Sequence, residues 1–112
     1  MIKPIELAEK YMESFFGKAP LETMESLFAE DLIFEGPYLN SKTAKDYLQA
    51  LQKDPPVKVN YEMEEIFEKE NSVCLIYQFS KLGIKTRMVQ IFEVADGKIC
   101  KIKLIFDTSA FT

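Results

Sequence analysis

The stretch QIFEVADGKICKIKLIFD, residues 90–107, predicts two antiparallel strands joined by a tight turn. Residues 95–97, Ala-Asp-Gly, supply the turn, because an Asp-Gly pair between apolar runs is a strong hairpin signal. We expect the first strand to run from Ile84 to Val94 and the second from Ile99 to Asp107. This hairpin makes the second half of the chain a candidate antiparallel sheet.

Two further strands are expected ahead of the hairpin. From Val57 onward apolar and polar side chains alternate, as they do in a strand with one buried face. The neighbouring pair Ile66 and Phe67 breaks this alternation, which predicts a bulge near residues 64–65. Residues 73–79 are apolar on both faces, so we expect this strand to lie inside the sheet rather than at its edge.

The first half of the chain shows helical spacing instead. Apolar residues recur every three or four positions after Pro4, again over residues 20–28, and a third time after Ser41, which can cap the third helix. Residues 32–34 predict a short strand between the second and third helices. The sequence Asp-Pro-Pro at 54–56 ends the third helix, because proline cannot continue a helix.

Alternation sorts the long strands into two faces. The inner face is almost wholly apolar and should meet the helices; it carries Val73, Leu75, Tyr77, Phe79, Met88, Gln90, Phe92, Val94, Cys100, Ile102, Leu104 and Phe106. The outer face has an apolar centre, at Ile76, Val89, Ile91 and Ile105, edged by charged residues. An apolar centre with a polar rim is typical of a protein interface, so we expect a homodimer through this outer face.

Composition excludes several classes of protein. With 112 residues we expect a single domain, residues 1–112, of the α+β class, with three N-terminal helices packed on a mainly antiparallel sheet. The net charge of −4 argues against binding to nucleic acid, whose phosphates require a basic face. The chain has no histidine, the commonest zinc ligand and acid–base residue, and we expect neither a metal nor another cofactor.

The location of the protein is inferred from two features. The N-terminal sequence has no long apolar run, so we expect neither a signal peptide nor a membrane span. Cys74 and Cys100 lie inside apolar runs, which indicates buried free thiols in a reducing compartment. Both features favour a cytoplasmic protein.

The segment FAEDLIFEGP, residues 28–37, and the ending at residues 90–107 resemble the NTF2-like superfamily, especially its SnoaL-like branch. That branch includes polyketide cyclases, ketosteroid isomerases and limonene epoxide hydrolases. The resemblance covers nearly the whole chain and implies a sheet curled around the helices into a cone, an apolar cavity inside it, and a homodimer through the outer face. Its motifs are patterns of aromatic and apolar residues, so they identify a fold better than an activity.

The resemblance to ketosteroid isomerases implies a partial catalytic site. In those enzymes the residue before the proline is an aspartate that acts as general base, and here Gly36 stands at that position. Their tyrosine donor on the first helix matches Tyr11, and their second donor matches Gln90. Glu35 is the carboxylate near the rim that would have to replace the base, but alternation points it away from Phe34, toward solvent or a dimer partner.

The resemblance to epoxide hydrolases is weaker in residue type. The Asp-Arg-Asp arrangement of those enzymes falls on the positions of Tyr77, Phe79 and Leu104 in this chain. None of these three side chains is ionic, so the resemblance does not extend to epoxide hydrolase chemistry.

We expect an apolar pocket between the first helix and the inner sheet face. Its predicted lining is Tyr11, Phe15, Phe34, Tyr38, Tyr77, Gln90, Phe92, Leu104 and Phe106. Tyr11 and Gln90 should lie close enough to bond each other or one shared acceptor. A buried amide without a partner costs about 1–3 kcal/mol, so Gln90 should bond Tyr11, a water or a ligand. For Tyr11, a purely structural role in the core is as consistent with the sequence as a ligand contact.

Three classes of function remain open on the sequence alone. The leading hypothesis is a protein that binds a small apolar molecule with an oxygen acceptor and lacks the usual catalytic base. The second is an isomerase or cyclase acting on an enolisable carbonyl compound through Tyr11 and Gln90, with Glu35 or a water as base. The third is a dimeric protein-interaction module whose cavity is filled by its own side chains.

Overall fold

The computed structural model describes residues 2–111. Residues 1 and 112, the two ends of the expected single domain, lie outside the described part of the chain. The elements, in chain order, are α1 (Pro4–Phe15), α2 (Thr23–Leu27), β1 (Phe28–Glu35), β2 (Asn40–Ser41), α3 (Ala44–Lys53), β3 (Val59–Lys69), β4 (Ser72–Lys81), β5 (Ile84–Ala95), β6 (Lys98–Phe106) and the 3₁₀ turn η1 (Thr108–Phe111). The expected α+β fold is confirmed.

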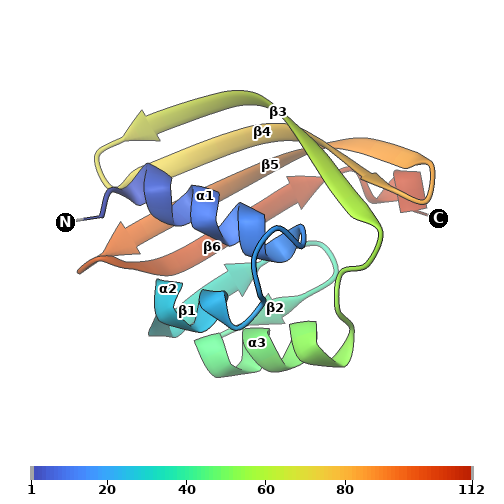
Figure 1. The fold of residues 1–112 in the computed structure, drawn as a ribbon. Helices are drawn as coiled ribbons and strands as arrows, with labels where there is room; N and C mark the ends of the chain where they lie inside the picture. The colour runs from blue at the N-terminus through green and yellow to red at the C-terminus, as the bar shows by residue number, and fades with distance from the viewer. Residues whose placement is uncertain (1, 112) are drawn as a thin grey trace.

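The strands form one sheet in the order β2-β1-β6-β5-β4-β3. Every neighbouring pair is antiparallel except β1 and β6, which are parallel. Figure 1 shows the long strands curving over α1, with α3 below β1 and β2. The sheet stays open, because β2 and β3 form its two edges and do not pair with each other. No helix within residues 2–111 is long and apolar enough to cross a membrane.

The predicted strand pattern of the second half is confirmed. The register of β3 against β4 shifts between Met63 and Glu65, which places the bulge where the sequence indicates it. β4 lies between β3 and β5, inside the sheet as expected for a strand apolar on both faces. The turn between β5 and β6 has Asp96 and Gly97 in the left-handed region, with φ of 52° and 74°. Positive φ at both central residues is what a two-residue hairpin turn requires.

The first half needs three corrections. The second helix is shorter than predicted, since it begins at Thr23 and gives way to β1 at Phe28. The strand predicted over residues 32–34 extends back to that same residue. Ser41 does not cap the third helix, because it pairs with Phe34 in the sheet; Thr43 is the cap, and its Oγ1 accepts a hydrogen bond from the backbone N–H of Asp46 at 3.1 Å.

The inner face of β4 and β5 is buried as predicted, but β6 differs. The register of β5 against β6 shifts between Glu93 and Val94, and this irregularity turns Ile99 inward to full burial. Cys100 is therefore only half-buried, and its thiol donates to the carbonyl oxygen of Glu93 at 3.3 Å. Cys74 lies on the outer face and is also half-buried. Both thiols are free, but the prediction that they are buried is wrong.

Candidate functional site

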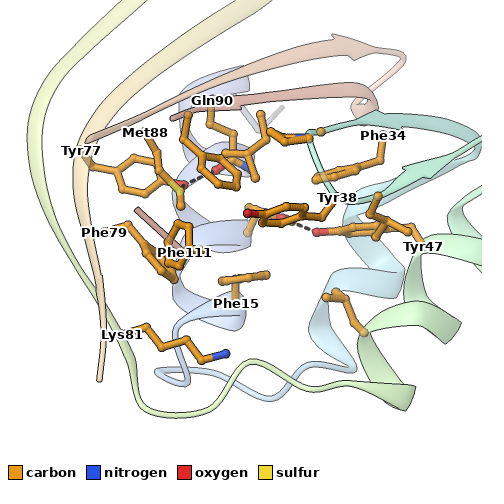
Figure 2. Close-up of a pocket in the computed structure, with 17 residues that line it drawn as sticks. Phe15, Phe34, Tyr38, Tyr47, Tyr77, Phe79, Lys81, Met88, Gln90 and Phe111 are labelled. Atoms are coloured by element: carbon orange, nitrogen blue, oxygen red, sulfur yellow. Dashed lines mark hydrogen bonds between the residues drawn. The ribbon is translucent and has the colours of Figure 1, made fainter. Parts of the chain in front are cut away.

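A cavity of about 640 Å³ lies among α1, α3 and the inner face of the sheet (Figure 2). Its walls come from every layer of the fold, because the curved sheet and the helices enclose the space between them. The lining residues are Tyr11, Phe15, Phe34, Gly36, Pro37, Tyr38, Leu39, Tyr47, Leu51, Tyr77, Phe79, Lys81, Met88, Gln90, Leu104, Phe106 and Phe111.

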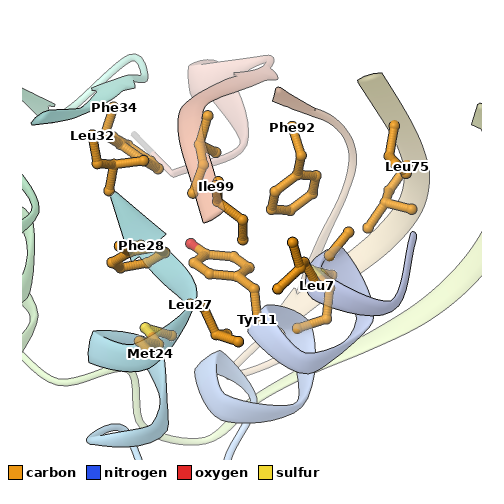
Figure 3. Close-up of a cluster of buried hydrophobic side chains, with 14 of the residues drawn as sticks. Leu7, Tyr11, Met24, Leu27, Phe28, Leu32, Phe34, Leu75, Phe92 and Ile99 are labelled. Carbon is orange, nitrogen blue, oxygen red and sulfur yellow. The ribbon is translucent and has the colours of Figure 1, made fainter. Parts of the chain in front are cut away.

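Eight of the nine predicted lining residues line this cavity; they are Tyr11, Phe15, Phe34, Tyr38, Tyr77, Gln90, Leu104 and Phe106. The exception is Phe92, which is fully buried in the core behind Tyr11, with ring centroids 5.3 Å apart in an edge-to-face contact (Figure 3). Placing Phe92 in the lining is therefore wrong, because α1 crosses the sheet at that point and covers the ring. That the eight other residues bind a ligand stays a prediction.

Two hydrogen bonds join the polar side chains of the cavity. The hydroxyl groups of Tyr11 and Tyr47 bond each other at 2.5 Å between oxygens. The Tyr77 hydroxyl donates to Oε1 of Gln90 at 2.7 Å. Tyr11 and Gln90 were expected to bond each other or one shared acceptor. The amide of Gln90 does interact with the Tyr11 hydroxyl and lowers its pKa, but the two bonds above join Tyr11 and Gln90 each to another tyrosine. We refer to these four residues as the tyrosine–glutamine network.

The network is neutral at physiological pH. Burial raises the pKa of Tyr11 to about 12, although hydrogen bonds with Tyr47 and Gln90 lower it in part. The pKa of Tyr47 is raised well above its ordinary value, first by burial and then by the neighbouring Tyr11. Burial also raises the pKa of Tyr77. Taking these hydroxyl groups out of water disfavours their charged form, so they act as uncharged hydrogen-bond donors.

The network contains more donors than its own hydrogen bonds use. Each hydroxyl carries one hydrogen and the glutamine amide carries two. The Tyr77 hydrogen goes to Gln90, and one hydrogen joins Tyr11 to Tyr47, whichever of the two donates. One hydroxyl hydrogen of the Tyr11–Tyr47 pair is therefore left over, and so is at least one amide hydrogen of Gln90, since the other serves the Tyr11 oxygen. A ligand oxygen beside this network would accept one of these unused hydrogens directly, without a bridging water.

The Glu-Gly-Pro stretch forms the rim of the cavity. Gly36 and Pro37 line it, and the backbone N–H of Gly36 donates to the carbonyl oxygen of Leu39 at 3.0 Å. A Cβ at position 36 would lie 3.0 Å from the ring of Phe34, which stacks on Tyr47 at 4.5 Å between centroids. A side chain at position 36 would therefore crowd the Phe34 ring, which would have to give by a few tenths of an ångström.

Glu35 lies on the outer side of the rim. Its carboxylate pairs with Nζ of Lys101 at 3.1 Å, and it does not line the cavity. Among the described residues that do line the cavity there is no aspartate or glutamate. Since the chain also has no histidine, the cavity wall offers donors without a carboxylate or imidazole base. Residues 2–111 likewise bring together no group of three side chains suited to a metal ion.

Two important lining residues were not among the predicted ones. Tyr47 follows the helical spacing that predicts the inward face of α3, but nothing in the sequence relates it to Tyr11, 36 positions earlier. Lys81 is the last residue of β4 and continues the inward series of Tyr77 and Phe79 by one step. Extending the alternation of that strand by two residues would have found it.

Comparisons with known proteins agree with this architecture. The model of a family described as SnoaL-like domain matches residues 8–102. An NTF2-like protein of unknown function from Cytophaga hutchinsonii is similar in structure, with 21% identity, a TM-score of 0.82, and 97% of this chain and 94% of that chain covered. No curated protein matches the chain in sequence.

Two further solved structures carry names of enzymes. One is a proposed ketosteroid isomerase from Kribbella flavida, with 23% identity, a TM-score of 0.79, and 90% of this chain and 75% of that chain covered. The other is an LEH-like epoxide hydrolase from M. tuberculosis, with 16% identity, a TM-score of 0.79, and 96% and 84% covered. The family-model match confirms the family expected from the FAEDLIFEGP segment, and the similar structures confirm the fold. At such identities they show the fold and carry no activity over to this chain.

Proposed function

Because this chain belongs to the SnoaL-like domain family, we propose that it binds a small apolar molecule that carries an oxygen acceptor. The observation that supports this most directly is the tyrosine–glutamine network, which presents surplus donors to an otherwise largely apolar cavity. A cavity of about 640 Å³ is within the size range of small-molecule sites, which are mostly apolar with a few placed polar groups.

The residues that line the cavity support binding without catalysis better than they support an enzymatic reaction. An isomerase or cyclase acting on an enolisable carbonyl compound would use Tyr11 and Gln90 to polarise the carbonyl oxygen, which the donor surplus favours. It would also need a group that removes a proton, and general acid–base catalysis contributes about 10²–10⁴-fold to such reactions. Glu35, the carboxylate considered for that step, pairs with Lys101 on the outer side of the rim. The enzyme is therefore the second candidate.

Native mass spectrometry of the purified protein tests the binding proposal. We expect a small apolar compound with a carbonyl, ether or ester oxygen to accompany the protein, and the double variant Tyr11→Phe/Tyr47→Phe, which removes both hydroxyls of the pair, to retain less of it. A protein that carries no such compound, and that also fails to bind the apolar dye phenylnaphthylamine, would contradict the proposal. Deuterium exchange at the α-carbon of a cyclic enone in D₂O, accelerated by the protein and lost in Tyr11→Phe/Tyr47→Phe, would favour the enzyme instead.

Substitution of Gln90 by leucine is expected to lower the free energy of unfolding by about 1–3 kcal/mol, because the buried Tyr77 hydroxyl then has lost its acceptor. The double variant Tyr77→Phe/Gln90→Leu should recover most of that loss, since it removes both partners of the bond. Urea unfolding of the wild type and of the three variants measures these differences. If the double variant were as unstable as Gln90→Leu, the bond to Tyr77 would not be the cause.

The outer face of the sheet supports a further part of this proposal, a homodimer. At the centre of this face the Ile105 residue is 54% exposed, and Ile76, Val89 and Ile91 are only half-buried within one chain. Ion pairs edge this face, Arg87 with Glu64 at 2.8 Å and Lys101 with Glu35 at 3.1 Å. An apolar centre inside a charged rim suits a self-complementary interface, and the same surface is where a protein-interaction module would bind a different partner.

Substitution of Ile91 by aspartate is expected to convert the dimer to a monomer or to aggregates, because a carboxylate at the centre of the interface would be buried without a partner. Sedimentation velocity measures the assembly state. Gln49→Asp, at an exposed position on α3, is the matched control and should sediment as the wild type does. A wild-type protein that stays monomeric at high micromolar concentration would rule out the homodimer.

A further inference from the structure

We propose that Lys81 makes the mouth of the cavity an anion-binding end, so that the ligand is an elongated apolar monoanion such as a carboxylate. This inference rests on the proposed binding function and specifies the chemistry of its ligand. The anionic group would sit on the Lys81 ammonium, the apolar body along the aromatic walls, and an uncharged oxygen of the same molecule at the tyrosine–glutamine network.

The direction of the Lys81 side chain follows from the strand. Lys81 ends β4 on the same face as Tyr77 and Phe79, and it pairs with Val59 of β3 and Ile84 of β5. The turn that follows has Leu82 and Gly83 in the left-handed region, with φ of 51° and 83°, which is typical of a tight two-residue hairpin. Backbone pairing on both sides thus holds the lysine at a fixed place on the inner face.

The surroundings of Lys81 are apolar. Figure 2 shows its amine directed into the cavity, with Phe79 and Phe111 between it and Tyr77. The rings of Phe79 and Phe111 pack at 6.1 Å between centroids, and that of Phe111 packs on Phe106 at 5.6 Å. Gln90 lies on the far side of these rings (Figure 2), so the cavity has a cationic end and a neutral donor end separated by aromatic walls.

Within residues 2–111 the Lys81 ammonium takes part in no ion pair or hydrogen bond, whereas Lys101 on the outer face pairs with Glu35. The side chain is half-buried, and the cavity wall described here contains no carboxylate that would neutralise it. A half-buried charge without a partner has lost part of its hydration, so an anion supplied by a ligand stabilises it more than it would a fully hydrated lysine.

The charges at the two ends decide between ligand classes. The chain as a whole carries a net charge of −4, but exposed charges more than about 10 Å away are screened, and Lys81 is the one charged residue among the described residues that line the cavity. One cation matches one negative charge, which favours a monoanion over a phosphate dianion. The neutral hydroxyls at the other end suit an uncharged oxygen, because nothing there would compensate a second charge.

Two fluorescent probes test this inference, because they share an aromatic body and differ in one charge. Anilinonaphthalene sulfonate is an apolar monoanion, and phenylnaphthylamine is its uncharged counterpart. Both gain fluorescence in apolar sites. We expect the wild type to bind the sulfonate more tightly than the neutral probe, and added salt to weaken only the sulfonate.

Substitution of Lys81 by methionine keeps the apolar stem and removes the charge. We expect the affinity for the sulfonate to fall about tenfold and that for phenylnaphthylamine to stay unchanged, since a tenfold loss is close to the lower end of the range for a hydrogen bond to a charged group, as suits a lysine that is only half-buried. Lys81→Arg should restore sulfonate binding. Lys85→Met is the matched control, because Lys85 lies on the opposite face of the same hairpin and is exposed; it should alter neither affinity.

A variant that fills the cavity, Leu104→Trp, shows where the probes bind, and both should lose affinity in it. Sulfonate binding that survives Leu104→Trp, or that is equal in the wild type and in Lys81→Met, would overturn the role of Lys81. If either result is found but the wild type binds phenylnaphthylamine, only this inference is wrong and the proposed binding function stands. If neither probe binds the wild type, this inference is wrong; if the purified protein also carries no apolar compound, the proposed function is wrong as well.

Discussion

Replacing Phe92 by alanine is expected to lower the free energy of unfolding by about 3–5 kcal/mol, the usual range for removing a fully buried aromatic ring from a core. Phe92 is fully buried, and Tyr11 packs edge-to-face against it. The lost stability has two parts. One is the free energy gained by burying the ring, and the other is the cost of the void left under α1, which the surrounding side chains fill only in part. Urea or thermal unfolding measures the difference.

The matched control for Phe92 is Phe106→Ala, on the neighbouring strand. Phe106 is only half-buried and lines the existing cavity, so its removal enlarges an open space rather than creating a new void. We expect this variant to lose less than half as much stability and to bind phenylnaphthylamine more weakly. Equal losses of stability in the two variants would mean that the Phe92 ring is packed no better than a ring at the cavity wall.

Alkaline pH is expected to destabilise the protein steeply between about pH 10 and pH 12. Below pH 10 the network tyrosines are protonated in both the folded and the unfolded state, so they make stability neither rise nor fall with pH. Above pH 10 the unfolded chain releases these protons while the folded chain keeps them, so stability falls as pH rises. Raising the pKa of Tyr11 from 10.0 to about 12 corresponds to a loss of about 3 kcal/mol for that residue, at 1.36 kcal/mol per unit.

The comparison with Tyr47→Phe isolates the network from other groups that titrate in the same range. Lysines lose protons in both proteins, so the difference between the two slopes reports Tyr47, whose pKa is also raised by burial. We expect the free energy of unfolding of the variant to fall less steeply, by about 1.4 kcal/mol per pH unit. Denaturant unfolding at several pH values measures both slopes, and identical slopes would show that burial does not hold this hydroxyl neutral.

The strands and their inner face follow from local rules, and for that reason the sequence predicts them. A side chain at every second position faces the same way, so Tyr77, Gln90, Leu104 and Phe106 could be assigned to one face without knowledge of the neighbouring strands. The Asp-Gly turn then fixes which strands pair. The same rule would have identified Lys81 had the predicted strand not ended at Phe79, where the apolar run stops.

The boundaries of the first half were less predictable, because tertiary pairing overrides local preference there. Phe28 fits a helical spacing with Met24, but in the structure it pairs with Ile99 of β6 and begins a strand. Ser41 is a suitable helix cap by residue type, yet its pairing with Phe34 places the cap two residues later. In each case pairing with another strand decides the element, and for Phe28 that strand is distant in the sequence.

By itself the sequence determined the α+β class, the antiparallel order of the last four strands, the apolar inner face and the absence of a carboxylate before Pro37. Only the tertiary structure decided that Tyr11 bonds Tyr47, that Gln90 accepts from Tyr77, that α1 covers Phe92, and that Glu35 pairs with Lys101. The physical reason is that alternation and helical spacing give the direction of a side chain relative to its own backbone. Its partner and its depth depend on strand register and on where a helix crosses the sheet, and distant parts of the chain set both of these.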